Sequence, residues 1–117
     1  MDDIQLNDPI PPCSWREWVA LAIRRRRLCR VNGDSMRPAL AHGDRVLYQP
    51  TRGCRVGDVV LAAHPFVAGQ TIIKRVEAFD DEGRVLLRGD DPLASSDSRG
   101  FGSVSPDAIL GRVTCRL

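Results

Sequence analysis

The sequence predicts a mainly β protein, an all-β barrel or folded sheet preceded by one short α-helix. Short runs of β-branched and aliphatic residues alternate with glycine- and aspartate-containing turns from residue 44 onward. Five such runs are expected to be strands, at residues 45–49, 58–62, 70–77, 84–88 and 109–113. The 117 residues suffice for one domain with a small core, because 43% of them are hydrophobic but only 5% are aromatic.

The helix is expected to begin after Ser14. The segment Ser14–Glu17 matches a capping box, in which the serine and glutamate side chains bond each other's backbone N–H groups. The apolar residues that follow recur at steps of three and four: Trp15, Trp18, Val19, Ala22 and Ile23. The helix is expected to end among Arg24–Arg27, whose charges suit the C-terminal end of the helix dipole. We therefore divide the chain into a leader with an amphipathic helix (residues 1–30) and a domain (residues 31–117).

The charged residues narrow the class of function. A formal net charge of +2 is too small for a general nucleic-acid coat protein. Among the 17 basic residues, Lys74 is the single lysine. Arginine does not lose its proton in proteins, whereas a buried lysine can. Lys74 is therefore a candidate for a role that requires an amine.

The four cysteines form no Cys-x-x-Cys pair, and the two histidines do not lie at zinc-finger spacing from them. The sequence therefore predicts no metal site and no cofactor. Free thiols in a reducing compartment are favoured, and two disulfides are the alternative for an exported protein. No apolar run reaches the length of a membrane span, and the acidic, polar first eight residues do not resemble a secretory signal. A cytoplasmic protein is expected.

Three segments carry candidate chemistry. In the first, Asn32–Pro38, Ser35 lies in a glycine-containing bend, although these residues also suit a plain turn before a short helical stretch. In the second, strand alternation places Lys74 on the same face as Ile72 and Val76. A lysine there either snorkels to the surface or is buried, and burial lowers the pKa of its ammonium group. A neutral amine beside a serine hydroxyl can act as a general base.

The third segment, Arg88–Gly102, is dense in aspartate, serine and glycine. The region from residue 90 to residue 108 is too long and polar for a tight turn, and loops of this size are often functional. A solvated surface loop would have the same composition. Asp97 and Arg99 can pair, and serine hydroxyls can hold a lysine amine by hydrogen bonds.

Together the three segments resemble the serine-lysine signal peptidase family (S26-like). The nucleophile motif of that family matches Ser35–Pro38, preceded by Gly33-Asp34. Further motifs follow in the family's order: Gly57–Val60, Ile73–Val76, Gly89–Asp91, Ser95–Arg99 and Gly111–Val113. The resemblance covers residues 31 to 113 and implies a signal-peptidase/LexA-like folded β-barrel. Asp91 stands where the family usually has asparagine.

The resemblance also implies the roles of individual residues in a serine endopeptidase. Ser35 would be the nucleophile and Lys74 the general base. Ser95 would hydrogen-bond the Lys74 amine, and Asp97 and Arg99 would brace the loop. Some relatives bind the oxyanion with a hydroxyl from the residue two before the serine. Gly33 stands at that position here and has no hydroxyl, so backbone N–H groups at Ser35 and Gly33 would bind the oxyanion.

By size and expected solubility the chain resembles the small peptidases that mature nickel-type superoxide dismutase. That resemblance implies a protein partner, a pro-enzyme whose N-terminal leader is removed. Three alternatives stay open at this point. They are a peripheral-membrane signal peptidase-like enzyme that contacts the bilayer through the Trp15/Trp18 helix, a self-cleaving LexA-type Ser-Lys protease, and a nucleic-acid-binding module that uses Arg24–Arg27. The residues upstream of Ser35 are too few for a DNA-binding domain, and the sequence predicts no nucleic-acid partner.

Overall fold

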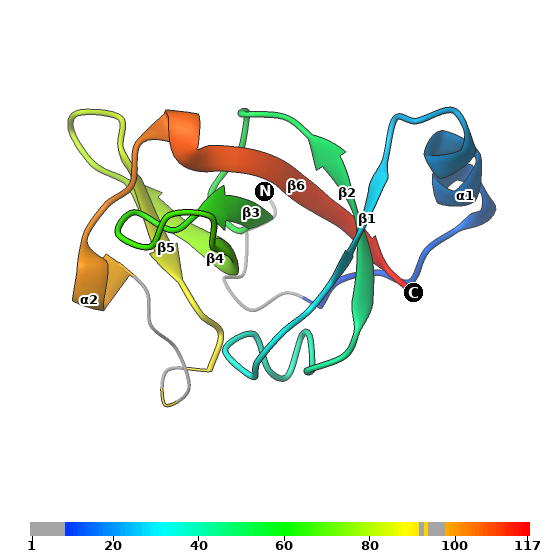
Figure 1. Cartoon of the computed structure of the whole chain (residues 1–117), viewed down its shortest axis with the longest axis horizontal. Helices are drawn as coiled ribbons and strands as arrows, with labels where there is room; N and C mark the ends of the chain where they lie inside the picture. Colours follow the sequence, from blue (N-terminus) through cyan, green and yellow to red (C-terminus); the bar gives the residue numbers. More distant parts are fainter. Residues whose placement is uncertain (1–8, 92, 94–97) are drawn as a thin grey trace, which may run out of the picture.

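Six strands form a single antiparallel sheet, whose strand order is β1-β2-β6-β3-β4-β5 (Figure 1). The computed structural model describes residues 9–91, 93 and 98–117. The strands are β1 (Arg27–Arg30), β2 (Arg45–Pro50), β3 (Val59–Ala63), β4 (Thr71–Phe79), β5 (Val85–Arg88) and β6 (Ile109–Arg116). The helical elements are α1 (Trp15–Ala22), α2 (Ser98–Phe101) and the 3₁₀ turn η1 (Pro106–Ala108). The predicted mainly β fold with a short N-terminal helix is confirmed.

The five predicted strands are present as β2 to β6, whereas β1 was not expected. The arginine run was expected to end the helix, but α1 ends at Ala22 and Arg24 turns the chain with a φ of 66°. Arg27 then begins β1, which pairs with β2. The four residues of β1 include no β-branched or aromatic side chain, so the strand pattern could not reveal it. The sheet therefore begins before the predicted domain boundary at residue 31.

Strand β6 joins the two halves of the sheet, because it pairs with β2 on one side and with β3 on the other. It crosses the molecule as the long red strand in Figure 1. At Gly111 a β-carbon would lie 2.5 Å from Cδ2 of Tyr48 and 2.9 Å from the backbone oxygen of Gln49. The absence of a side chain at Gly111 therefore lets the Tyr48 ring pack directly on β6.

Two hydrophobic clusters form the core. The first lies over β3, β4 and β5 and contains Val60, Ala62, Ile72, Val76, Val85, Leu87, Val104 and Ile109. The second contains Ile10, Val31, Met36, Leu40, Val46 and Val59. Met36 is only 1% exposed, and it directly follows the candidate nucleophile Ser35. The second cluster therefore fixes the serine segment to the body of the protein.

A disulfide joins Cys13 to Cys115, so the prediction of free thiols is wrong for these two residues. Their Cα atoms lie 4.8 Å apart although 102 residues separate them in sequence. Backbone bonds bring the two chain ends together: the Cys13 N–H donates to the Arg116 carbonyl at 2.9 Å, and the Arg116 N–H donates to Pro11 at 2.8 Å. Cys29 and Cys54 are free thiols. Sequence spacing carries no information about such a pairing of the two ends.

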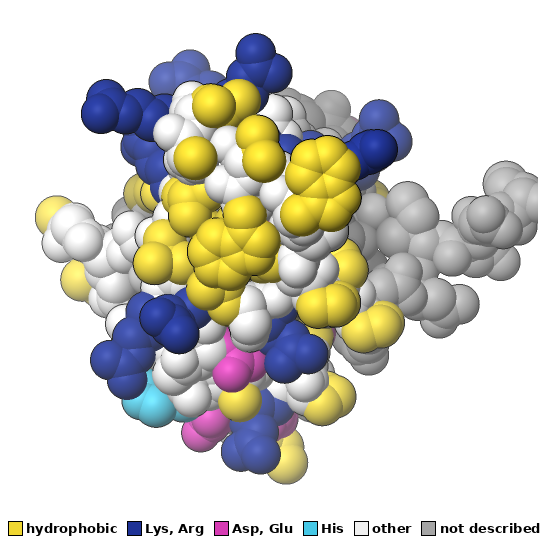
Figure 2. Space-filling model, turned by 90° about the vertical axis from the view of Figure 1, so that its right-hand side faces the viewer, with side chains coloured by type: hydrophobic (Ala, Val, Ile, Leu, Met, Phe, Trp, Pro, Cys, Tyr) yellow, Lys and Arg dark blue, Asp and Glu magenta, His cyan; other side chains and the backbone are white. Residues whose placement is uncertain are grey.

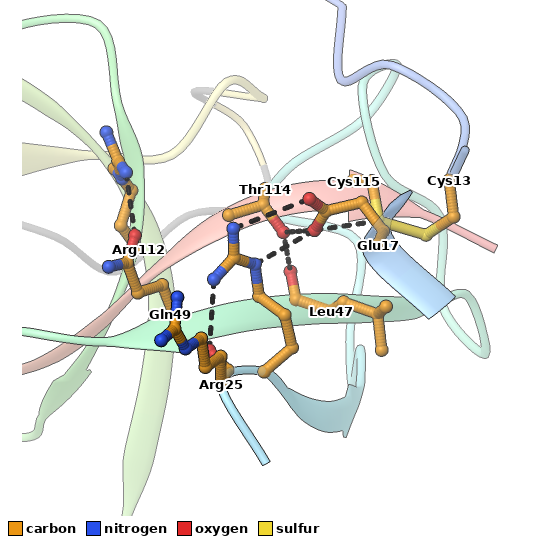
Figure 3. Close-up of polar contacts among 9 residues, drawn as sticks. Cys13, Glu17, Arg25, Leu47, Gln49, Arg112, Thr114 and Cys115 are labelled. Atoms are coloured by element: carbon orange, nitrogen blue, oxygen red, sulfur yellow. Dashed lines mark hydrogen bonds and ion pairs between the residues drawn. A yellow bond between two sulfur atoms is a disulfide. The ribbon is translucent and has the colours of Figure 1, made fainter. Parts of the chain in front are cut away.

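Helix α1 begins where the sequence predicts, but not by the predicted capping box. Ser14 is the N-cap in extended conformation, yet its side chain makes no capping hydrogen bond. The Glu17 carboxylate instead accepts hydrogen bonds from Arg26 Nε at 3.0 Å and from the Thr114 hydroxyl (Figure 3). Desolvation opposes the charged form of Glu17, but these hydrogen bonds and the Arg26 charge together lower its pKa. Among the residues that the structure describes, no helix has both the length and the apolar character needed to cross a bilayer.

Replacing Gly111 by alanine should destabilise the protein by about 1–3 kcal/mol, because the new methyl group overlaps the Tyr48 ring and the Gln49 carbonyl. Urea denaturation would measure the change in the free energy of unfolding. Gly100→Ala is the matched control, since a β-carbon at Gly100 meets no atom within 4 Å. Equal stability of the Gly111→Ala variant and the wild type would contradict the close packing of β2 on β6.

Candidate active site

Ser35 lies in the turn that connects β1 to β2, and it is half-buried. The turn is held by backbone hydrogen bonds from Arg37 N–H to Asp34 (3.2 Å) and from Leu40 N–H to Met36 (2.9 Å). Because the Met36 side chain is fixed in the core, the neighbouring Ser35 side chain has a defined position at the surface. The backbone of this segment is the turn that the sequence also suited, and the buried Met36 side chain holds that turn in place.

Gly33, two residues before the serine, has a φ of 90°, a conformation that favours glycine. Its N–H donates a 2.8 Å hydrogen bond to Nδ1 of His42. His42 therefore holds the start of the serine turn from the next turn of the chain. The bond also engages the Gly33 N–H, one of the two backbone groups expected to bind an oxyanion.

Lys74 lies in the middle of β4, and its side chain is only 5% exposed. It pairs in register with Val60 of β3, which is fully buried. Ile72 and Val76, on the same face by alternation, are also buried. The alternative of a surface lysine that snorkels into water is therefore wrong.

Ser35 and Lys74 line the same pocket, which has a volume of about 530 Å³. The pocket is formed by the end of β1 with the serine turn (residues 29–36), by the start of β4 (residues 70–74) and by His64. The Nδ1 atom of His64 accepts from the N–H groups of Phe66 (3.0 Å) and Val67 (3.1 Å). Cys29 also lines the pocket, and burial raises the pKa of its thiol.

A buried ion pair lies next to Lys74 in the chain. Arg75 donates from Nε and from a terminal nitrogen to the two carboxylate oxygens of Asp90, each at 2.9 Å. Its other terminal nitrogen donates to the Gly57 carbonyl at 2.9 Å. The two charged side chains are 3% and 1% exposed. The pair therefore ties β4 to the segment that follows β5, and to the turn before β3.

The residue after this aspartate contacts the serine turn. The Asp91 N–H donates to the Ser35 carbonyl at 2.8 Å. The Asp91 carboxylate accepts a hydrogen bond from the Leu93 N–H at 3.0 Å. The Arg75–Asp90 ion pair and the Asp91–Ser35 hydrogen bond thus connect the strand of Lys74 with the turn of Ser35.

The structure describes only one of the three residues that were predicted to support the dyad. Ser95 and Asp97 lie outside the described residues, as does any pairing between Asp97 and Arg99. Arg99 lies in α2 with its side chain exposed. In the described part of the segment from residue 90 to residue 108, which was expected to be a loop, the chain forms the short helical elements α2 and η1.

Sequence reasoning missed the supporting residues His42, His64, Arg75 and Asp90. Arg75 and Asp90 lie in two of the quoted motifs, but fifteen residues separate them. His42 lies in the turn before β2, and nothing in the local sequence pattern indicates that its ring accepts a hydrogen bond from Gly33. The one available signal was that Arg75 and Asp90 belong to motifs of the same family, and membership of a motif does not show which residues pair.

Two comparisons with known proteins agree with this geometry. A family model described as Peptidase S24-like matches residues 16–113. The mitochondrial inner membrane protease subunit 1 of Schizosaccharomyces pombe is 30% identical over 110 residues, covering 74% of this chain and 70% of that protein. The family model includes the serine turn and every described residue of the pocket.

Replacing Arg75 by methionine should lower the free energy of unfolding by about 3–5 kcal/mol, because it leaves the Asp90 carboxylate buried without its guanidinium partner. The double variant Arg75→Met/Asp90→Leu should recover part of this loss, since no buried charge remains. Urea denaturation measures both changes. In the matched control, Arg52→Met removes an exposed ion pair with Asp107 and should leave stability nearly unchanged. A loss no larger than that of the control would contradict the role given to the buried pair.

Proposed function

The chain belongs to the S24-like family of signal-peptidase-type serine peptidases, and from this premise we propose that it removes an N-terminal leader from a pro-protein with a Ser35–Lys74 dyad. One observation carries the assignment of the dyad. The turn serine and the buried lysine, 39 positions apart, line one pocket. A serine hydroxyl and a desolvated amine are the two groups that this type of hydrolysis requires.

In the proposed reaction the Lys74 amine accepts the Ser35 hydroxyl proton while Oγ attacks the carbonyl carbon of the scissile bond. The resulting tetrahedral intermediate collapses when the protonated amine gives this proton to the departing nitrogen, and an acyl-serine remains. Water then attacks the ester, again with Lys74 as the base, and releases the leader and free serine. Burial favours the neutral amine that the first step needs, because an ammonium group loses its hydration there.

Of the two predicted backbone donors, the N–H of Ser35 is the one that we assign to the oxyanion. The second predicted donor, the Gly33 N–H, already donates to His42. Its engagement favours a positioning role for Gly33, since the bond sets the turn from which the Ser35 N–H projects. The roles of Ser95 as a hydrogen-bond partner of Lys74, and of Asp97 and Arg99 as a brace, stay predictions from the family resemblance.

The pro-protein is proposed to bind as an extended strand. Strand β1 stands at one end of the strand order, and its residues Cys29 and Arg30 line the pocket. A peptide added beside β1 gains backbone hydrogen bonds and brings its side chains alternately into the pocket. This mode requires no particular sequence in most of the leader, which suits a peptidase that selects its substrate at one position.

We propose a nickel superoxide dismutase precursor as the substrate, supported by the resemblance of the chain, in size and expected solubility, to the small peptidases that mature this enzyme. Cleavage would expose the N-terminal residues that bind nickel. The cytoplasm remains the proposed compartment. The Cys13–Cys115 disulfide is an argument against a cytoplasmic location, because such bonds persist mainly in oxidising compartments.

Co-expression with a nickel superoxide dismutase precursor should produce a new N-terminus at the metal-binding residues, detected by mass spectrometry. Ser35→Ala should abolish cleavage and leave the fold intact, because alanine removes the attacking oxygen and little else. Ser14→Ala is the matched control, since the Ser14 side chain lies outside the pocket and makes no capping bond. An uncleaved precursor in the presence of folded wild-type enzyme would contradict the proposed substrate. An active Ser35→Ala protein would contradict the proposed dyad.

Lys74→Arg should be as inactive as Lys74→Ala, because arginine keeps the positive charge but cannot release its proton near neutral pH. Wild-type activity should rise with pH as the Lys74 ammonium group deprotonates and the neutral base becomes available. Single-turnover rates across a pH series measure both effects. Retained activity in Lys74→Arg would assign the lysine to charge-based substrate anchoring. A flat profile with the chemical step rate-limiting would count equally against the base.

A further inference from the structure

Helix α1 presents its apolar face to solvent rather than to the core. The residues of this face are Trp15, Trp18, Val19 and Ile23, which are 70%, 48%, 49% and 58% exposed. Trp15, Trp18 and Val19 are spaced so that they lie on one side of the helix, and Ile23 is its C-cap residue. An amphipathic helix of a soluble domain normally packs this side against the core, yet none of the α1 residues is buried. The face therefore needs a partner outside the described chain.

Arginines surround this apolar face. An open pocket of about 740 Å³ lies between α1, the arginine run and the end of β2. Its lining residues are Arg16, Val19, Ala20, Ile23, Arg24, Arg25, Arg26, Arg27, Gln49 and Pro50. Arg26 pairs with Glu17. The other four arginines are exposed, and within the described part of the chain none of them pairs with a carboxylate.

The positive charge of the protein is concentrated at this end. Residues 14–30 contain six arginines and one glutamate, whereas acidic residues outnumber basic ones, fourteen to eleven, in the rest of the chain. Figure 2 shows hydrophobic side chains gathered on this face, with Lys and Arg side chains around them. The face is thus complementary to a surface that is apolar inside and negatively charged at its boundary.

We propose that the apolar face of α1 and the arginine pocket dock the protein on a bilayer that contains anionic phospholipids. Tryptophan and arginine are the residues that suit the two layers of that surface, the acyl boundary and the phosphates. The guanidinium groups pair with phosphate oxygens, and the two tryptophans enter the headgroup region. In Figure 1 the helix projects at one end of the molecule. A projecting ridge inserts into a bilayer, whereas a folded protein partner would need a matching groove.

The helix is held firmly enough to orient the whole protein. The disulfide from Cys13 to Cys115 fixes the segment before α1 to β6. The Glu17 carboxylate, on the inner side of the helix, bonds Thr114 of β6 and Arg26 (Figure 3). Docking through the outer side of α1 therefore sets the orientation of the sheet relative to the membrane. The proposal does not depend on the peptidase activity.

The test measures binding of the inactive Ser35→Ala protein to vesicles of phosphatidylcholine alone and to vesicles of an equal mixture with phosphatidylglycerol. Trp15 and Trp18 are the two tryptophans of the sequence, so tryptophan emission, excited selectively over that of Tyr48, reports on α1 alone. We expect co-flotation with the mixed vesicles, a blue shift of the emission, and a strong decrease of both at high salt. Vesicles of phosphatidylcholine alone should bind weakly.

Variants separate the two parts of the surface. Arg24→Gln/Arg25→Gln/Arg27→Gln should weaken binding to mixed vesicles by roughly tenfold or more, and Val19→Ser/Ile23→Ser should remove the blue shift. The matched controls are Arg55→Gln and Phe66→Ala, exposed residues outside α1 and both pockets, which should bind like the parent protein. Thermal denaturation confirms that each variant is folded.

Three results would overturn the proposal: no binding to mixed vesicles, equal loss of binding in the controls, or binding unaffected by either α1 variant. Duplex DNA that displaces the protein from vesicles and binds it more tightly at the same salt concentration would assign the arginines to a nucleic acid instead. Because no outcome involves cleavage, a failure here leaves the peptidase proposal as it stands, and a failure of that proposal leaves this one.

Discussion

The geometry of the candidate active site depends on one buried ion pair, Arg75 with Asp90. Burying two charges is unfavourable unless their geometry and remaining hydrogen bonds compensate. Here two 2.9 Å bonds join the side chains, and a third reaches the Gly57 carbonyl. Each partner is adjacent in sequence to a residue of the site: Lys74 precedes Arg75, and Asp91, which follows Asp90, bonds the Ser35 carbonyl. The pair therefore couples the position of the lysine strand to that of the serine turn.

The sequence predicted what depends on local pattern. Strands β2 to β6 were predicted from the alternation of apolar residues and from the turns between them. Lys74 shares a face with Ile72 and Val76, so its burial was one of the two predicted possibilities. Features that depend on distant partners were missed. The Cys13–Cys115 disulfide joins the two chain ends. Glu17 had a local explanation as a capping residue, but bonds with Arg26 and with Thr114 of β6 outweigh it.

In the candidate site, too, some residues were predictable from the sequence and others were not. The family resemblance selected Ser35 and Lys74, and the structure brings both to one pocket although no periodicity relates them. Arg75 escaped notice for a physical reason. Adjacent strand residues face opposite sides, so a buried Lys74 suggests an exposed Arg75. In this sheet both sides are covered at that position, and the arginine is tolerated in the interior because Asp90 neutralises it.

Strand β1 links the two surfaces of the molecule that carry proposals. Arg27 at its start lines the arginine pocket beside α1, and Cys29 and Arg30 at its end line the pocket of Ser35 and Lys74. From Arg27 to Arg30 an extended chain spans about 10 Å. A leader that adds to β1 would therefore run from the docked face to the catalytic pocket within a few residues. The strand that the sequence pattern concealed is therefore the one that connects the two proposals, membrane docking and peptide cleavage.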